Sequence, residues 1–259
     1  MTGSPTAARA ALRLQATLLL RSPGSVQPLF TAPLYALIFT AMAKHSGRPD
    51  SLGYAVVVPV LISLWTMALL TAGDLVAQDR FDGTLELLVA APARMAVVTT
   101  ARVAAVTGVS LVTLVECWCT TALVVGHWPP VPHPFLLAAG ALATAFALTC
   151  AACLLSAGFV LARSARVFQN SLSYPLYLLA GLTVPLSALP GWVRPLSRLF
   201  FLSWSADLLR RSVEAAPVPD AAGRLAAVVL LGLLWYAVAL FAFRVVLTRV
   251  RATGTAGLV

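Results

Sequence analysis

Long uninterrupted apolar runs limit most strongly what this chain can fold into. A helix needs about 20 apolar residues to cross the hydrocarbon core of a bilayer. Six runs come close to that length, namely residues 26–43, 53–73, 103–125, 134–162, 171–189 and 225–243. They are continuous rather than alternating, which argues against a transmembrane β-barrel. Because unsatisfied backbone groups are too costly in lipid for other structures, we predict an all-α integral membrane protein in which residues 1–259 form one domain with six transmembrane helices.

The charges of the chain fit a membrane protein better than a nucleic-acid-binding protein. Only 10% of the residues are charged and 60% are hydrophobic, whereas soluble domains average about 25% charged residues. The net charge is +9, but the arginines fall between the apolar runs, where they set topology and meet anionic headgroups. Most of the 18 Lys and Arg residues lie on the cytoplasmic side if the N-terminus is inside. We expect the lipid bilayer as a partner, no nucleic acid, and both termini in the cytoplasm.

A basic amphipathic segment precedes the first apolar run. Residues 1–49 contain no acid, and Arg9, Arg13, Thr17 and Arg21 are spaced four apart. On a helix this spacing forms one polar stripe, and leucines cover much of the remaining surface. We predict a helix over about 6–22 that lies in the headgroup layer with its basic face to the cytoplasm. The alternative is a disordered basic tail followed by an early span.

The loop over about 74–95 combines charges with a short apolar helix. Gly83 can supply a turn and Thr84 can cap a helix, which Pro92 would end. The apolar residues of this helix include Leu85, Leu87 and Leu88, and the charges come from Asp79, Arg80, Asp82 and Glu86. Such an element presents apolar side chains to a groove on a soluble partner, while its charges fix the register. The alternative is a solvated loop with one turn of helix.

A proline-rich segment over about 185–215 separates the last two runs. Pro185 and Pro190 interrupt the fifth helix as it leaves the membrane. Trp192 suits a membrane interface because its apolar ring carries one polar N–H. We predict a bent, re-entrant element on the outer side rather than a seventh span.

Two of these segments resemble one protein family. The loop resembles the charged Glu-Arg-Glu-x-Gly-Thr-Leu-Glu stretch, followed by Leu-Leu and a Pro, of type-2 ABC exporter permeases, which are membrane subunits of bacterial drug, antibiotic and polysaccharide exporters. The matching positions are Arg80, Gly83, Thr84, Leu85, Glu86, Leu87, Leu88 and Pro92. The sequence departs from the pattern at Gln78, Asp79 and Asp82, although the two aspartates keep acids nearby. A Gly…Pro…Leu-Pro-x-Trp segment of the same family is similar to the outer segment, at Gly181, Pro185, Pro190 and Trp192.

The resemblance implies a function as well as a fold. In this family the charged loop forms a coupling helix against a separate ATPase subunit, and two permease chains, identical or different, form the translocation pathway. This implies an exporter subunit in a bacterial plasma membrane that is not itself an enzyme. The chain has no G-x-x-x-x-G-K-[ST] motif for cradling phosphates, so we expect ATP and Mg²⁺ on the partner and no cofactor here.

Other chemistry-bearing residues give weaker signals. Glu116 interrupts the third run, and an intramembrane acid is either a contact in the pathway or a structural partner of another helix, unless it is kept near one interface. We interpret Cys150 and Cys153 as small packing residues rather than a redox or zinc pair. No metal site is expected. The alternatives are a haem-export-type ABC membrane subunit, a secondary transporter and an intramembrane enzyme, and the transported substrate stays open.

Overall fold

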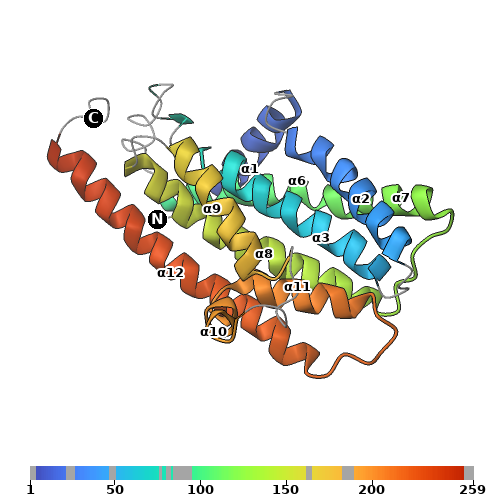
Figure 1. The fold of residues 1–259 in the computed structure, drawn as a ribbon. Helices are drawn as coiled ribbons and strands as arrows, with labels where there is room; N and C mark the ends of the chain where they lie inside the picture. The colour runs from blue at the N-terminus through green and yellow to red at the C-terminus, as the bar shows by residue number, and fades with distance from the viewer. Residues whose placement is uncertain are drawn as a thin grey trace.

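The computed structural model describes residues 4–21, 27–46, 51–75, 78–79, 83, 95–161, 165–182 and 190–253. All regular structure within these residues is helical, which agrees with the predicted fold class. The helices in chain order are α1 (Ser4–Arg21), α2 (Gln27–Ser46), α3 (Ser51–Thr66) with its π-helical continuation η2 (Met67–Ala72), α6 (Met95–Ser110), α7 (Val112–Val125), α8 (Pro134–Leu161), α9 (Ala165–Leu179), α10 (Val193–Arg198), α11 (Phe201–Ser212) and α12 (Ala221–Thr253). They form an elongated bundle (Figure 1).

Four stretches of helix in the described residues are long and apolar enough to cross a membrane. They are Gly53–Ala72, Met95–Val125, Pro134–Gly158 and Ala221–Val246, and they overlap the second, third, fourth and sixth apolar runs. The first run lies within α2, which is not among the four. The fifth run overlaps α9, whose 15 residues are about 22 Å long, short of a 30 Å hydrocarbon core. The number of six spans therefore stays a prediction.

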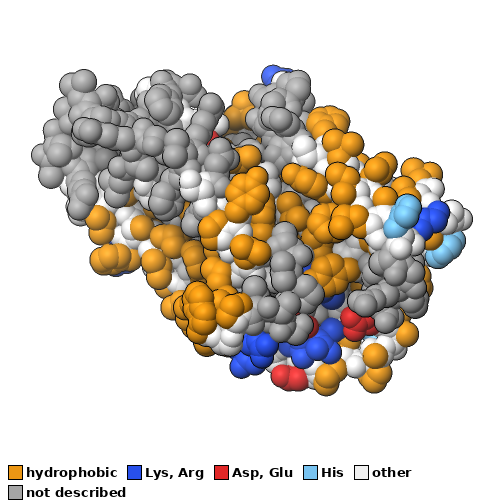
Figure 2. Space-filling model, viewed as in Figure 1, with side chains coloured by type: hydrophobic (Ala, Val, Ile, Leu, Met, Phe, Trp, Pro, Cys, Tyr) orange, Lys and Arg blue, Asp and Glu red, His pale blue; other side chains and the backbone are white. Residues whose placement is uncertain are grey.

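Large apolar side chains cover much of the outside of the bundle. Phe135 is 90% exposed and Leu123 is 85% exposed, and long stretches of hydrophobic surface follow the helices in Figure 2. A soluble monomer rarely exposes contiguous apolar surface of this extent. The surface therefore fits lipid or another membrane chain as its surroundings.

The α3 helix forms the centre of the bundle and contacts α2, α7 and α11. Its apolar side chains are almost fully buried, including Leu61, Leu64 and Trp65. At η2 the hydrogen bonding changes register, so that the Gly73 N–H donates to the carbonyl of Ala68 at 2.9 Å. The Ser156 hydroxyl of α8 donates to the Ala72 carbonyl at 2.7 Å, which gives a partner to a group at the end of the π-helix.

Hydroxyl pairs join neighbouring helices inside the bundle. Thr40 of α2 pairs with Thr121 of α7 at 3.1 Å, Thr66 of α3 with Tyr177 of α9 at 3.0 Å, Thr100 of α6 with Tyr236 of α12 at 3.2 Å, and Thr107 of α6 with Thr149 of α8 at 2.6 Å. Such bonds hold helices together where lipid tails leave no hydrophobic force between them. The helices α8 and α12 approach most closely at Gly232, where a Cβ atom would lie 2.9 Å from the Ala147 Cα.

The two ends of the bundle carry different elements. The C-terminal end of α12 lies at the upper left of Figure 1, and we call this end of the bundle, which includes Asp79, the Asp79 end. The C-terminal ends of α2 and α7 and the first turns of α8 and α12 lie at the opposite end, which we call the Lys44 end. The helices α10 and α11 lie toward the Lys44 end, and α11 packs against α8, α12 and α3.

Candidate functional site

Three polar side chains meet at the Asp79 end of the bundle, and we call them the Gln15–Asp79–Arg102 cluster. The Arg102 Nη1 lies 2.5 Å from the Asp79 Oδ2, and the Arg102 Nε donates to the Gln15 Oε1 at 3.0 Å. The Arg102 and Asp79 side chains are only 12% and 11% exposed, and Gln15 is buried. The cluster therefore joins α1, the segment after η2, and α6 through charge-assisted hydrogen bonds shielded from water.

Local structure explains how these three side chains come together. One face of α1 packs on α6, with Ala11, Gln15 and Leu19 buried at spacings of four residues. Two turns into α6, Arg102 meets this face next to Gln15. The Gln78 N–H donates to the Asp74 carbonyl at 2.8 Å, and this single helical turn brings Asp79 to the same place.

The remaining faces of α1 are both basic and apolar. Arg9, Arg13 and Arg21 are exposed, and the Thr17 hydroxyl donates to the Arg13 carbonyl at 2.9 Å. The exposed leucines of the helix are Leu12, Leu14 and Leu18. A helix that exposes leucines beside arginines while a third face packs on α6 has the surface of an element in the headgroup layer.

Most of the predicted coupling residues lie outside the described part of the chain. These are Arg80, Asp82, Thr84, Leu85, Glu86, Leu87, Leu88 and Pro92. Of the others, Asp79 belongs to the cluster and Gly83 is exposed with a φ of 68°. Only glycine adopts that left-handed conformation readily, which is the property expected of a turn residue at this position.

The sequence-based prediction of this site missed Gln15 and Arg102. A buried amide within an amphipathic helix gives no signal before the partner helix is known. Arg102 was read as a loop residue before the third run, whereas α6 begins at Met95 and includes it. Asp79 was the one residue in the sequence that could have indicated the pair. If a membrane helix continues past Arg102, at the edge of an apolar run, that arginine needs a counter-charge such as Asp79.

The comparison with family models decides the identity of the chain. A model described as ABC-2 type transporter matches residues 7–213, from the first turn of α1 to just beyond α11. This chain belongs to the ABC-2 type transporter family. The match confirms the resemblance stated from the two sequence segments. Comparison with curated proteins finds no match.

As an ABC-2 family member the chain is the membrane component of an ABC transporter. Glu116 is an acid within one of its candidate spans, where it could contact the transport pathway. Glu116 lies in α7 and is half-buried. Its Oε2 is buried and has no hydrogen-bond partner among the described residues. In the described part of this chain, the carboxylate therefore does not have the arginine or backbone partner that a structural role would require.

The Lys44 end of this ABC-2 protein contains a second buried cation. Arg210 of α11 donates from Nη2 to the Gly181 carbonyl at 2.7 Å, and its guanidinium stacks 3.9 Å from the centroid of the Tyr54 ring. The Tyr54 hydroxyl donates to the same carbonyl at 3.3 Å. Burial lowers the pKa of Arg210. These contacts fix α11 to the start of α3 and to the end of α9, where Gly181 has a φ of 68°.

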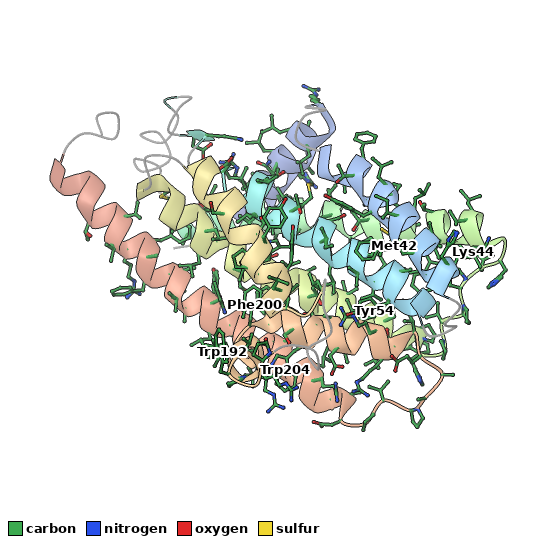
Figure 3. The ribbon with its side chains drawn as sticks, viewed as in Figure 1. Met42, Lys44, Tyr54, Trp192, Phe200 and Trp204 are labelled. Carbon is green, nitrogen blue, oxygen red and sulfur yellow. The ribbon has the colours of Figure 1, made fainter. Side chains whose placement is uncertain are left out.

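The predicted outer residues are only partly described. Pro185 lies outside the described residues, Pro190 is exposed, and Trp192 is 72% exposed just before α10 (Figure 3). The Trp204 indole donates to the Arg198 carbonyl at 2.8 Å, which holds the turn between α10 and α11. The two helices replace a simple connector between the last two runs.

Proposed function

We propose that this ABC-2 protein is the permease subunit of an ATP-driven exporter, and that the Gln15–Asp79–Arg102 cluster transmits movement of the coupling loop to the membrane helices. The observation that supports the proposal is the shielded ion pair between Asp79 and Arg102. It joins the segment that begins the coupling loop to a helix of membrane-spanning length. A loop tied in this way cannot move far without moving α6 as well.

The Asp79 end then faces the cytoplasm, where the ATPase subunit binds the loop. ATP and Mg²⁺ belong to that subunit, because this chain lacks a phosphate-binding motif. Closure of the ATPase moves the loop, and the cluster carries the displacement into α1 and α6 together. This is a rigid-body change between two packings, driven by differential binding of the two states.

The complete transporter contains two permease chains, either two copies of this one or a pair, with the pathway between them. Export from the cytoplasm across a bacterial plasma membrane follows from the family resemblance. The α10–α11 pair is the re-entrant outer element, and Pro185, Pro190 and Trp192 belong to its entry.

Co-purification with the ATPase tests this function. The tagged chain is isolated in mild detergent from cells that express its neighbouring genes, and ATPase activity is measured in the eluate. We expect an ATPase subunit to co-purify and Glu86→Arg to remove it without loss of membrane insertion. Glu214→Arg is the matched control, because Glu214 is an exposed acid just beyond the end of α11. A folded chain that purifies alone under every condition contradicts the proposal and favours a secondary transporter or membrane enzyme.

A further inference from the structure

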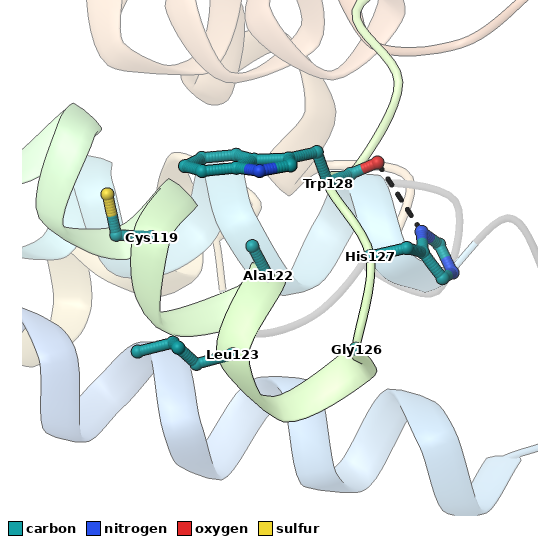
Figure 4. A pocket seen from close by; sticks show the side chains of 6 residues that line it. All are labelled: Cys119, Ala122, Leu123, Gly126, His127 and Trp128. Atoms are coloured by element: carbon teal, nitrogen blue, oxygen red, sulfur yellow. Dashed lines mark hydrogen bonds between the residues drawn. The ribbon is translucent and has the colours of Figure 1, made fainter.

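An apolar groove lies on the outside of the last turns of α7, at the Lys44 end. Its volume is about 450 Å³, and it is lined by Cys119, Ala122, Leu123, Gly126, His127 and Trp128. Figure 4 shows the Trp128 indole alongside the last turns of α7, extending past Ala122 toward the Cys119 thiol. Both Leu123 and Trp128 are largely exposed, so the groove opens to the surroundings of the bundle. Its volume is within the range of ligand sites, which is about 300–1,000 Å³.

One cationic side chain, Lys44, lies next to the last turn of α7, which lines this groove. The Lys44 ammonium donates to the Val124 carbonyl at 3.3 Å, which places it beside the groove-lining residues of the last turn of α7. An ammonium has three N–H donors, so two remain for another acceptor. His45 and His127 are exposed at the same end (Figure 2). Lys44 forms no ion pair within the described residues.

The position of the groove along the helix matches a membrane interface. Charged side chains contact the α6–α7 stretch at Arg102, which pairs with Asp79, and at Val124, which accepts from Lys44. A helix rises 1.5 Å per residue, so these two positions are about 33 Å apart. The hydrocarbon core is about 30 Å thick. When the Gln15–Asp79–Arg102 cluster lies at one interface, Lys44 lies at the other. Trp128 supports this depth, because tryptophan concentrates at the boundary between headgroups and acyl chains.

We propose that this groove binds an acidic phospholipid, with its phosphate at Lys44 and an acyl chain along Leu123 toward Cys119. The apolar lining fits the chain, and the unneutralised Lys44 ammonium selects an anionic headgroup. Cys119 and Leu123 are one helical turn apart, so the chain runs along α7 into the bilayer. The proposal requires that the protein is embedded in a membrane, and it does not depend on the ATPase partner.

Alkylation of Cys119 measures occupation of the groove. Cys119 is half-buried at the edge of the groove, whereas the other three cysteines of the chain are buried. The purified protein in detergent reacts with a maleimide in the presence of phosphatidylglycerol or of phosphatidylcholine with the same acyl chains. We expect phosphatidylglycerol alone to slow the reaction by at least about threefold. Cys119→Ala identifies the signal that belongs to this thiol.

Substitutions of Lys44 decide whether the headgroup is recognised. Lys44→Gln should abolish the protection and Lys44→Arg should retain it, and an unchanged unfolding temperature shows that each variant is folded. Equal protection by both lipids, protection by neither, or full protection of Lys44→Gln by phosphatidylglycerol overturns the proposal. Loss of ATPase binding in the co-purification experiment changes none of these outcomes, so the two ideas fail separately.

Discussion

The ion pair between Asp79 and Arg102 predicts an energetic dependence of one side chain on the other. The two side chains are 12% and 11% exposed, so the charges are largely shielded from water. Removing one partner of a buried pair costs about 3–5 kcal/mol, whereas replacing both with apolar residues of similar volume is nearly neutral. Because the pair is not completely buried, we expect about 3 kcal/mol for Asp79→Leu and for Arg102→Met. The double variant should lose only about 1 kcal/mol, because no unpaired charge is left and Gln15 loses one hydrogen bond.

The buried cysteines provide the assay. Cys117 and Cys153 are fully buried, so a thiol-reactive fluorophore reports their exposure as the protein unfolds on heating. For a chain of this size, 1 kcal/mol corresponds to about 2–4 °C in Tm. Each single variant should therefore unfold about 6–12 °C lower, and the double variant about 2–4 °C lower. Arg9→Leu, which removes an exposed charge of α1, is the control and should leave Tm unchanged. A double variant as unstable as the sum of the two single variants refutes the ion pair.

Three further predictions use the same thermal assay. Gly232→Ala should lower the free energy of unfolding by about 1–3 kcal/mol, because the new Cβ lies 2.9 Å from the α8 backbone. Gly108→Ala has open space around it and should raise the free energy of unfolding by about 0.5–1 kcal/mol through helix propensity. Equal effects would show that the two sites are packed alike. Arg210→Met should lower the free energy of unfolding by about 2 kcal/mol, because it removes the hydrogen bond to Gly181 and the contact with the Tyr54 ring. Arg211→Met removes the half-exposed ion pair with Asp207 on the helix surface and should change stability by under about 0.5 kcal/mol. Glu116→Gln should raise Tm, because a buried oxygen without a partner stops carrying charge; a lower Tm would show that the carboxylate has a partner.

Apolar pattern and charge spacing predicted the helical elements well, because both act within one helix. The expected helix over about 6–22 corresponds to α1 at Ser4–Arg21, and the second, third, fourth and sixth runs overlap helices of spanning length. The π-helix η2 could not be predicted in this way. The donor to its terminal Ala72 carbonyl is Ser156, which comes from α8 more than eighty residues later.

The start of the third span shows why charge alone misplaced a boundary. Arg102 was taken to end the apolar run on its N-terminal side, since an isolated charge is costly in lipid. In the structure the helix begins earlier, at Met95, where Asp79 neutralises the Arg102 guanidinium and Gln15 accepts a hydrogen bond from its Nε. Both partners come from other segments. The pattern of apolar residues and charges therefore could not predict the contacts between side chains that come from segments distant in sequence.

The same helix geometry predicts a depth for Glu116 in the membrane. From Arg102 to Glu116 the helix rises about 21 Å, and from Glu116 to Val124 about 12 Å. If Arg102 and Val124 mark opposite interfaces of a core about 30 Å thick, Glu116 lies inside the hydrocarbon region. Its Oε2 has no partner among the described residues. A charge at this depth costs about 2.5–3.5 kcal/mol on insertion scales, so we expect the carboxyl group either to be protonated or to receive a partner that the described residues do not supply, such as a second permease chain or a passing substrate.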